Sequence, residues 1–233
     1  MERALFFFMH CLHLRREEKR RDMNTYQELL ESLERDGYLK SPSLIEAFRT
    51  ADRARFVPEE IRARAYENCP LPIGEGQTIS QPLTVALMLE FLAPVRGNIV
   101  LDVGCGSGWQ AAILAYVVGI QGKVIALERV KALVDRVTAT LTEMLPKDIH
   151  NVVRVVYADA TAGFAKAAPY DRIISAAAGS TIPQAWKDQL VVGGRIVAPV
   201  GESLVVLEKT GPDEFTERRF HGFQFVPLVE GVA

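Results

Sequence analysis

Apolar residues in the first third of the chain recur every three or four positions, which is the spacing of helices. This spacing predicts a helix over residues 26–36, and a serine–proline pair typical of a helix start precedes a second helix over residues 44–51. Another helix start is indicated near Pro58, and helical spacing returns over Pro82–Leu92. We expect these helices to form a cap that precedes the main sheet.

From residue 98 onward, strand and helix patterns alternate. The predicted strands cover residues 99–103, 123–128, 152–157, 172–176 and 195–200, and the predicted helices between them cover residues 109–118, 130–144 and 183–190. Runs such as VVRVVY lack polar alternation, as expected where both faces of a parallel sheet are covered. The alternation predicts a doubly wound, mostly parallel α/β fold. Residues 203–209 and 215–228 then predict an antiparallel edge of successive strands.

Residues 71–82 (LPIGEGQTISQP) interrupt the helical spacing with two glycines and two prolines, so we expect an ordered loop without regular structure. Loops of this length inside a domain are often functional. The expected organisation is thus an extension over residues 1–22 and one domain over residues 23–233. Within that domain, residues 23–97 hold the helices and the loop, and residues 98–233 hold the sheet.

Composition narrows the possible functions. The 233 residues are 48% hydrophobic and 24% charged, as in ordinary globular proteins. The formal net charge of -2 provides no general attraction to nucleic acid or to an anionic membrane, so we expect neither as a partner. The three cysteines have no metal-binding or disulfide spacing, which indicates a cytoplasmic protein without a metal site. Within the extension, residues 5–14 are apolar but too short to span a bilayer, and translation beginning at Met23 is an alternative.

A glycine-rich turn, LDVGCGSGW over residues 101–109, joins a predicted strand to a predicted helix. Glycines there let the main chain approach a ligand closely. A carboxylate stands at the end of this strand and of each of the next two. Asp102 precedes the first glycine by two positions, and Glu128 and Asp159 stand at the ends of the later strands. Asp102 can organise the turn or face a cation, Glu128 can accept ribose hydroxyl protons, and Asp159 can reach an adenine amino group. The alternative is that Glu128 and Asp159 only cap the helices that follow.

Carboxylates without a lysine favour a cationic nucleoside over a nucleoside triphosphate, and the G-x-G-x-G spacing differs from the dinucleotide fingerprint. We therefore predict S-adenosyl-L-methionine as the cofactor, with S-adenosyl-L-homocysteine as the product. The residues predicted to bind the cofactor are Asp102, Gly104, Gly106, Ser107, Glu128, Asp159 and Ala160.

The order GEGQTISQP, VALMLEFL, LDVGCGSG resembles the protein-L-isoaspartate O-methyltransferases, which are Rossmann-like class I methyltransferases. The resemblance continues through GKVIALE, APYDRII and QLVVGGRIVAPVG to the closing FVPL, and so covers residues 24–228. It implies methylation of the α-carboxylate of L-isoaspartyl residues in damaged proteins and peptides, which starts repair through a succinimide. It also implies that Ser80 contacts and orients this carboxylate, although a serine before Gln81-Pro82 can equally cap the following helix.

The sequence departs from the family pattern at Ala160, where the family commonly has glycine, in the segment SAAAGSTIPQA and in the N-terminal extension. Because an ionised carboxylate needs no general base, His150 and His221 are interpreted as ordinary histidines. We expect a monomer. The alternatives are a methyltransferase for another acceptor, a cofactor-binding module without turnover and, disfavoured by the glycine spacing, an NAD-dependent oxidoreductase.

Overall fold

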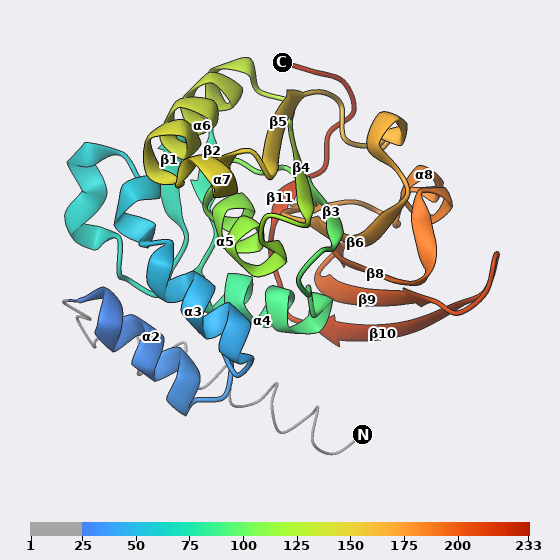
Figure 1. Cartoon of the computed structure of the whole chain (residues 1–233), viewed down its shortest axis with the longest axis horizontal. Helices are drawn as coiled ribbons and strands as arrows, with labels where there is room; N and C mark the ends of the chain where they lie inside the picture. Colours follow the sequence, from blue (N-terminus) through green and yellow to red (C-terminus); the bar gives the residue numbers. More distant parts are fainter. Residues whose placement is uncertain (1–24) are drawn as a thin grey trace.

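The computed structural model describes residues 25–233, and a seven-stranded sheet runs through its centre (Figure 1). The strands lie in the order β10-β9-β8-β6-β3-β4-β5. Their bounds are β3 (Ile99–Val103), β4 (Lys123–Glu128), β5 (Val153–Tyr157), β6 (Tyr170–Ser175), β8 (Leu190–Val200), β9 (Ser203–Lys209) and β10 (Phe215–His221). The five strands from β8 to β5 are parallel, and β9 and β10 add the antiparallel edge. The predicted α/β fold is confirmed.

The order of the strands fixes where a ligand can bind. From β3 the chain moves outward through β4 to β5, and then returns to place β6 on the other side of β3. In open α/β sheets, ligands bind at the carboxyl ends of the strands where the order reverses in this way. The glycine-rich turn after β3 lies at this point.

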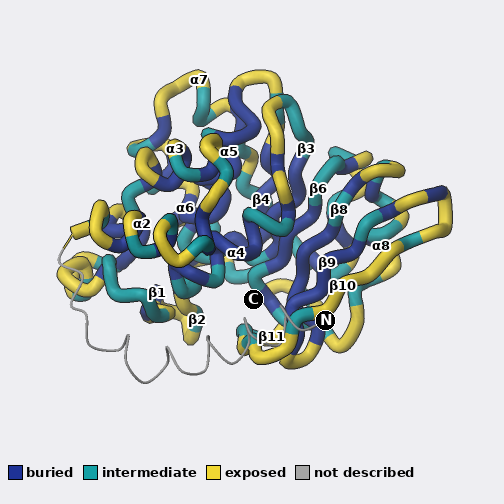
Figure 2. Tube along the Cα trace, turned by 90° about the horizontal axis from the view of Figure 1, so that it is seen from below, coloured by how far each residue is buried: buried dark blue, intermediate teal, exposed yellow. Residues whose placement is uncertain are grey.

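Helices on one face of the sheet enclose the larger core, and short segments cover the other face. The larger core takes in α4 (Pro82–Leu92), α5 (Trp109–Val118), α6 (Lys131–Met144) and the short α7 (Lys147–His150). The smaller core lies under α8 (Gln184–Asp188) and the 3-10 helix η4 (Ala165–Ala167). Residues of each strand alternate between the two cores, so that Val100 faces the larger and Leu101 the smaller. The strands from β9 to β4 are mostly buried (Figure 2), whereas the edge strands β5 and β10 contain no buried residue.

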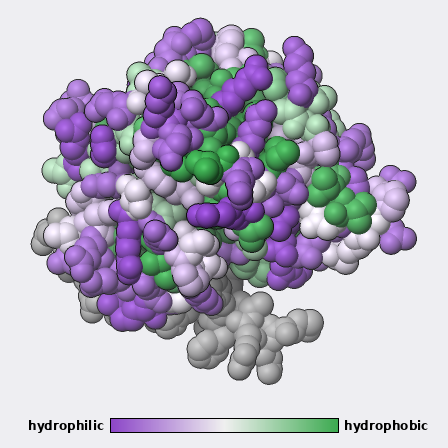
Figure 3. Space-filling model, viewed as in Figure 1, coloured by the Kyte–Doolittle hydropathy of each residue, from purple (hydrophilic) through white to green (hydrophobic). Residues whose placement is uncertain are grey.

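The N-terminal cap consists of α2 (Tyr26–Arg35), α3 (Pro42–Thr50) and the 3-10 helices η2 (Arg53–Phe56) and η3 (Glu59–Arg64). A reciprocal capping box between Thr25 and Glu28 begins α2. Phe48 packs edge-on against Trp109 of α5, which joins the cap to the sheet. Outward side chains of the cap are mostly hydrophilic (Figure 3). The predicted extension, residues 1–22, lies outside the described residues.

The structure corrects the expectation that residues 71–82 form a loop without regular structure. They form an antiparallel hairpin of β1 (Leu71–Gly74) and β2 (Gln77–Ile79), followed directly by α4. Glu75 and Gly76 both have positive φ, as two-residue hairpin turns require. The sequence signal was weak because β1 contains a proline and β2 has only three residues.

Several other elements differ from their predicted bounds, such as β8, which begins at Leu190 and not at residue 195. The helix expected over residues 183–190 is shorter, because Leu190 already belongs to β8 and pairs with Tyr170. The strand pattern over residues 215–228 is divided into β10 and a separate β11 (Val226–Pro227), which pairs with β7 (Ala177–Ala178). This second, two-stranded sheet brings the end of the chain to the carboxyl ends of β3 and β6.

Gly108 ends the glycine-rich turn with φ +84°, and a Cβ built there would overlap Cγ2 of Val137 on α6. We predict that Gly108→Ala lowers the free energy of unfolding by about 2–5 kcal/mol, from left-handed strain and overpacking. Urea unfolding measures this change. Gly97→Ala is the matched control, since Gly97 also has positive φ but has nothing within 4 Å of the added Cβ, and should cost only about 1–2 kcal/mol. Equal losses in the two variants would contradict the packing argument, and Val137→Ala should partly restore Gly108→Ala.

Candidate functional site

The glycine-rich turn between β3 and α5 is held to the neighbouring strand by main-chain hydrogen bonds. The N–H groups of Gly104 and Cys105 both donate to the carbonyl of Leu127, at 2.9 and 3.0 Å. Gly104 and Gly106 have positive φ, which only glycine adopts at low cost. The turn therefore has a fixed shape that exposes its main chain at the carboxyl end of the sheet.

Glu128, the last residue of β4, completes this frame. Its Oε2 accepts a hydrogen bond from the N–H of Gly106 at 3.1 Å. Its Oε1 accepts from the N–H groups of Arg129 and Val130, at 2.8 and 2.9 Å. A carboxylate has about four acceptor positions, so these three contacts leave about one position for a further donor. Glu128 is thus oriented by the main chain with its carboxylate at the cavity described next.

A cavity of about 400 Å³ lies in front of the turn. Its floor is the sheet edge with Gly104, Gly106 and Glu128, and one wall is the end of the hairpin with Thr78 and Ser80. Residues 224–229, which contain β11, form the opposite wall. Its volume is within the range of small-molecule sites. Three segments far apart in the sequence therefore meet around one space.

The structure brings together some of the predicted site residues and separates others. Those that line the cavity are Ser80, Gly104, Gly106, Glu128 and Ala160. Ser107 lies instead at a neighbouring cavity of about 430 Å³, which Gly106 also lines, and its hydroxyl accepts from the N–H of Trp109 at 3.3 Å. Asp102 and Asp159 line neither cavity. Among the described residues that line the first cavity, Glu128 is the only carboxylate and Arg129 the only cation.

Ser80 is half-buried between β2 and α4. Its carbonyl accepts from Arg53, and its hydroxyl has no hydrogen-bond partner among the described residues. The N-cap of α4 is Gln81, and the N–H of Leu83 donates to the side chain of Asn68 at 3.1 Å. Ser80 is therefore not the helix cap, and its hydroxyl is left available beside the cavity.

Asp102 lies behind the turn and is completely buried. Its Oδ1 accepts from the side-chain amide of Gln110 at 2.7 Å, and its Oδ2 has no partner among the described residues. Burial raises the pKa of Asp102 to about 7; the Gln110 hydrogen bond lowers it, and the nearby Glu128 carboxylate raises it. This position favours the interpretation that Asp102 organises the turn over direct contact with a ligand.

The carboxylate of Asp159 accepts hydrogen bonds from two main-chain N–H groups and one hydroxyl. Its Oδ1 accepts from the N–H and hydroxyl of Thr161, and its Oδ2 accepts from the N–H of Gly231 at 2.7 Å. Burial raises the pKa of this carboxyl, but the hydrogen bonds from Gly231 and Thr161 and the charge of Arg129 outweigh it, so that the pKa lies below its usual value. Asp159 thus binds the last residues of the chain, while its neighbour Ala160 lines the cavity.

Sequence reasoning missed the part of the site that the C-terminal residues and Arg129 build. Arg129 donates through Nε to the carbonyl of Gly231 at 2.9 Å, and its own carbonyl accepts from the N–H of Ala233 at 2.7 Å. These contacts hold residues 224–229 beside the cavity. The only signal in the sequence was the FVPL segment, because a two-residue strand leaves no pattern of its own.

The remaining candidates do not line the cavity. Burial raises the pKa of Cys105 well above its usual value, so its thiol stays protonated and fills space. His150 contacts Thr142, and His221 lies 2.9 Å from the hydroxyl of Ser203. Within residues 25–233, no cluster of three or more His, Cys, Asp or Glu residues is placed to hold a metal ion, and no helix is long and apolar enough to cross a membrane.

The buried carboxyl of Asp102 predicts a pH dependence of stability. Because its pKa rises from about 3.8 to about 7 on folding, the folded chain holds this proton more tightly than the unfolded chain. The stability of the wild type should therefore fall relative to Asp102→Asn as pH rises from about 4 to about 7, by up to roughly 4 kcal/mol, and then level off. Urea unfolding of both proteins across this range tests the prediction. A difference that stays constant with pH would contradict it.

Comparison with known proteins identifies the family. A family model described as protein-L-isoaspartate(D-aspartate) O-methyltransferase matches residues 24–233. A protein-L-isoaspartate O-methyltransferase of Methanopyrus kandleri is 42% identical over 207 residues, which cover 87% of this chain and 90% of the relative. That of Ignicoccus hospitalis is 42% identical over 219 residues, which cover 92% of this chain and 99% of the relative.

Solved structures agree. The crystal structure of a Plasmodium falciparum protein-L-isoaspartate O-methyltransferase in complex with S-adenosyl-L-homocysteine superimposes with a TM-score of 0.79 at 25% identity, and covers 88% of this chain and 99% of that one. With a family match over all the described residues, the chain belongs to the protein-L-isoaspartate(D-aspartate) O-methyltransferase family.

Proposed function

We propose that this protein transfers the methyl group of S-adenosyl-L-methionine to the α-carboxylate of L-isoaspartyl residues in damaged proteins and peptides. The observation that carries the proposal is that Ser80, Gly106 and Glu128 line one cavity. A group suited to a carboxylate acceptor thus lies beside groups suited to a nucleoside. The family, and the S-adenosyl-L-homocysteine bound by the Plasmodium falciparum relative, support the same assignment.

On the cofactor side, the residues present fit a cationic nucleoside. Glu128 is 5% exposed and has about one unused acceptor position for a ribose hydroxyl. Gly104 and Gly106 leave the floor without side chains, and Ala160 leaves only a methyl group there. Ser107, Asp102 and Asp159 would support the loop and the rim rather than touch the cofactor. When bound, the cofactor supplies an electrophilic methyl group on a sulfonium.

On the acceptor side, no general base is needed, because a carboxylate is already ionised at neutral pH. A carboxylate oxygen forms the new bond to the methyl carbon as the carbon–sulfur bond breaks, and the electron pair stays on sulfur. The Ser80 hydroxyl can donate one hydrogen bond to the carboxylate and hold it in line. Thr78 and Gln77 continue the same wall. The adjacent amide nitrogen then attacks the methyl ester and releases methanol, which closes a succinimide whose hydrolysis returns some normal aspartate.

The partners that we propose are isoaspartyl proteins and peptides, with no nucleic acid or membrane, consistent with a net charge of -2. We also propose a cytoplasmic monomer. Residues 23–97 and 98–233 would form a single methyltransferase domain, since the hairpin and the glycine-rich turn line one cavity.

The function is tested with labelled S-adenosyl-L-methionine and two peptides that differ only in an isoaspartyl or an aspartyl residue. We expect labelling of the isoaspartyl peptide alone. Equal labelling of both, or of neither, would contradict the proposal. Calorimetric titration with S-adenosyl-L-methionine and NAD completes the test, because cofactor binding without transfer would indicate a binding module, and preference for NAD an oxidoreductase.

We predict that Ser80→Ala lowers kcat/KM for the isoaspartyl peptide about 10- to 100-fold, since a hydrogen bond to a charged group contributes about 1.5–3 kcal/mol. The Kd for S-adenosyl-L-homocysteine should change less than about 3-fold, because Ser80 is assigned to the acceptor. Steady-state kinetics and calorimetry provide both values. Ser43→Ala, at an exposed position of α3, is the control and should match the wild type. A large loss of cofactor affinity in Ser80→Ala would assign Ser80 to folding or cofactor binding.

We predict that Glu128→Gln weakens S-adenosyl-L-homocysteine binding about 10-fold or more, because an amide loses charged hydrogen bonds to the ligand. Calorimetry measures the Kd. Glu143→Gln is the matched control, because the Glu143 side chain is 82% exposed on α6 and pairs only weakly with Arg55, at 3.9 Å. Unchanged affinity in a folded Glu128→Gln protein would remove Glu128 from the cofactor site.

A further inference from the structure

Arg53 is a buried cation without a carboxylate partner. It begins η2, its side chain is completely buried, and none of the ion pairs among the described residues includes it. A buried charge is costly unless its hydrogen-bonding groups are satisfied. Its position therefore depends on the hydrogen bonds that the guanidinium forms.

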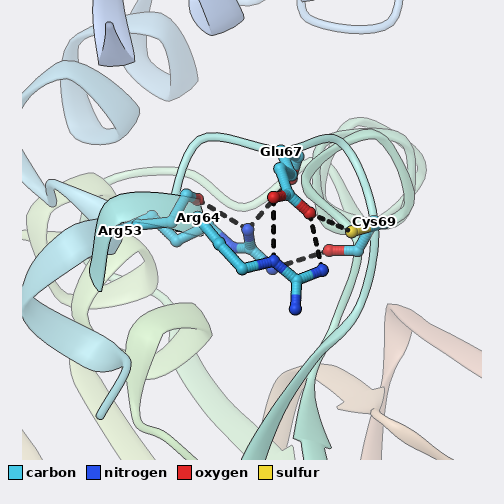
Figure 4. A network of polar contacts seen from close by, with 5 residues as sticks. Arg53, Arg64, Glu67 and Cys69 are labelled. Atoms are coloured by element: carbon cyan, nitrogen blue, oxygen red, sulfur yellow. Dashed lines mark hydrogen bonds and ion pairs between the residues drawn. The ribbon is translucent and has the colours of Figure 1, made fainter. Parts of the chain in front are cut away.

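Four main-chain carbonyls take the place of a carboxylate, and Figure 4 shows those of Glu67 and Cys69 beside the Arg53 guanidinium. Nη1 donates to the carbonyls of Ala65 and Glu67, at 2.6 and 3.1 Å. Nη2 donates to the carbonyls of Cys69 and Ser80, at 2.9 and 3.0 Å. One planar group thus ties the turn over residues 65–69 to the end of the hairpin.

The same guanidinium also contacts the start of α5. Its Cζ lies 5.5 Å from the ring centroid of Trp109, in a cation–π arrangement. Trp109 directly follows Gly108, and its indole N–H is anchored to the carbonyl of Ala51 at 2.8 Å. Arg53 therefore lies between the acceptor wall and the helix that follows the glycine-rich turn.

The carboxylate of Glu67 pairs with another arginine and not with Arg53. The Glu67 carboxylate pairs with Arg64, with Nε to Oε1 at 2.8 Å and Nη2 to Oε2 at 2.9 Å, and it also accepts from the thiol of Cys69 (Figure 4). Only the main chain of Glu67 contacts Arg53. Burial lowers the pKa of Arg53 to about 10, while Cys69, Tyr26 and Glu67 raise it, so the guanidinium stays charged near neutral pH.

The carbonyl of Ser80 and its hydroxyl have different surroundings. The carbonyl is fixed by Arg53, whereas the hydroxyl lies beside the cavity without a partner among the described residues. The position from which the hydroxyl projects is therefore determined by the main chain that carries it. On the following side, the Gln81 side chain donates to the carbonyl of Asn68, and the Asn68 side chain accepts from Leu83, which closes the same turn onto α4.

We propose that Arg53 is a positioning residue, which holds the main chain of Ser80 so that its hydroxyl is aimed at the acceptor carboxylate. This inference rests on the proposed function. Lysine cannot reproduce the arrangement, because an ammonium group is a point charge with three donors and no plane to stack or to bridge two pairs of carbonyls. Loss of the guanidinium should therefore affect the acceptor and spare the cofactor.

The test is a double-mutant cycle in kcat/KM for the isoaspartyl peptide at saturating S-adenosyl-L-methionine, with wild type, Arg53→Lys, Ser80→Ala and the double variant. We expect Arg53→Lys to lose about 10- to 100-fold, the effect of misplacing a reacting group by about 1 Å. In the Ser80→Ala background the same change should cost less than about 3-fold. The Kd for S-adenosyl-L-homocysteine should stay within about 3-fold of the wild type throughout. Arg62→Lys, exposed on η3, is the control for an arginine-to-lysine change.

The inference is overturned if the kcat/KM losses of the two single variants multiply in the double variant. It is also overturned if Arg53→Lys weakens S-adenosyl-L-homocysteine binding by as large a factor as it lowers kcat/KM. Either result leaves the proposed function intact. A wild type that labels neither peptide would overturn the proposed function and the inference with it. If Arg53→Lys does not fold even with S-adenosyl-L-homocysteine present, Arg53→Gln replaces it in the cycle. Failure of both variants to fold would assign Arg53 to folding alone and refute a positioning role.

Discussion

The site depends on the attachment of the glycine-rich turn to the end of β4. The Leu127 carbonyl accepts from Gly104 and Cys105, and the next side chain, Glu128, accepts from Gly106. Consecutive residues of one strand thus fix both the path of the turn and the carboxylate beside it. Because a sheet is stiff, this attachment gives the floor of the cavity a defined shape before any ligand arrives. The hairpin and the C-terminal segment then only need to be placed against it.

Much of this floor could be predicted from the sequence. Alternating apolar strands and helices indicated the parallel sheet, and glycine spacing with Glu128 twenty positions after Gly108 indicated a nucleoside site. Such features are encoded locally, since the length of a strand decides which residue stands at its end. The resemblance around the TIS segment added Ser80, which no periodicity would have singled out.

The directions of the other carboxylates could not be predicted. Asp102 is one residue inside β3, where the alternation of a strand turns it into the core toward Gln110. Asp159 stands at a strand end, but the N–H of Gly231 from the far end of the chain occupies it. Residues 224–229 are placed at the site by the pairing of β11 with β7, and strands of two residues are too short to be recognised in a sequence. Each of these outcomes depends on contacts between distant segments, which local patterns do not contain.

The hydrogen bonds of Arg53 have a consequence for how this protein can vary. All four acceptors are main-chain oxygens, so the side chains at positions 65, 67, 69 and 80 take no part in accepting them. Evolution or an engineer can therefore change the side chains of Glu67 and Cys69 without removing an acceptor of Arg53. Ala65 is completely buried and the Asn68 side chain holds the turn to α4, so these two positions stay constrained. Tolerance at positions 67 and 69 follows because a single arginine donates all four of these hydrogen bonds, so the constraint falls on Arg53 rather than on the residues that it binds.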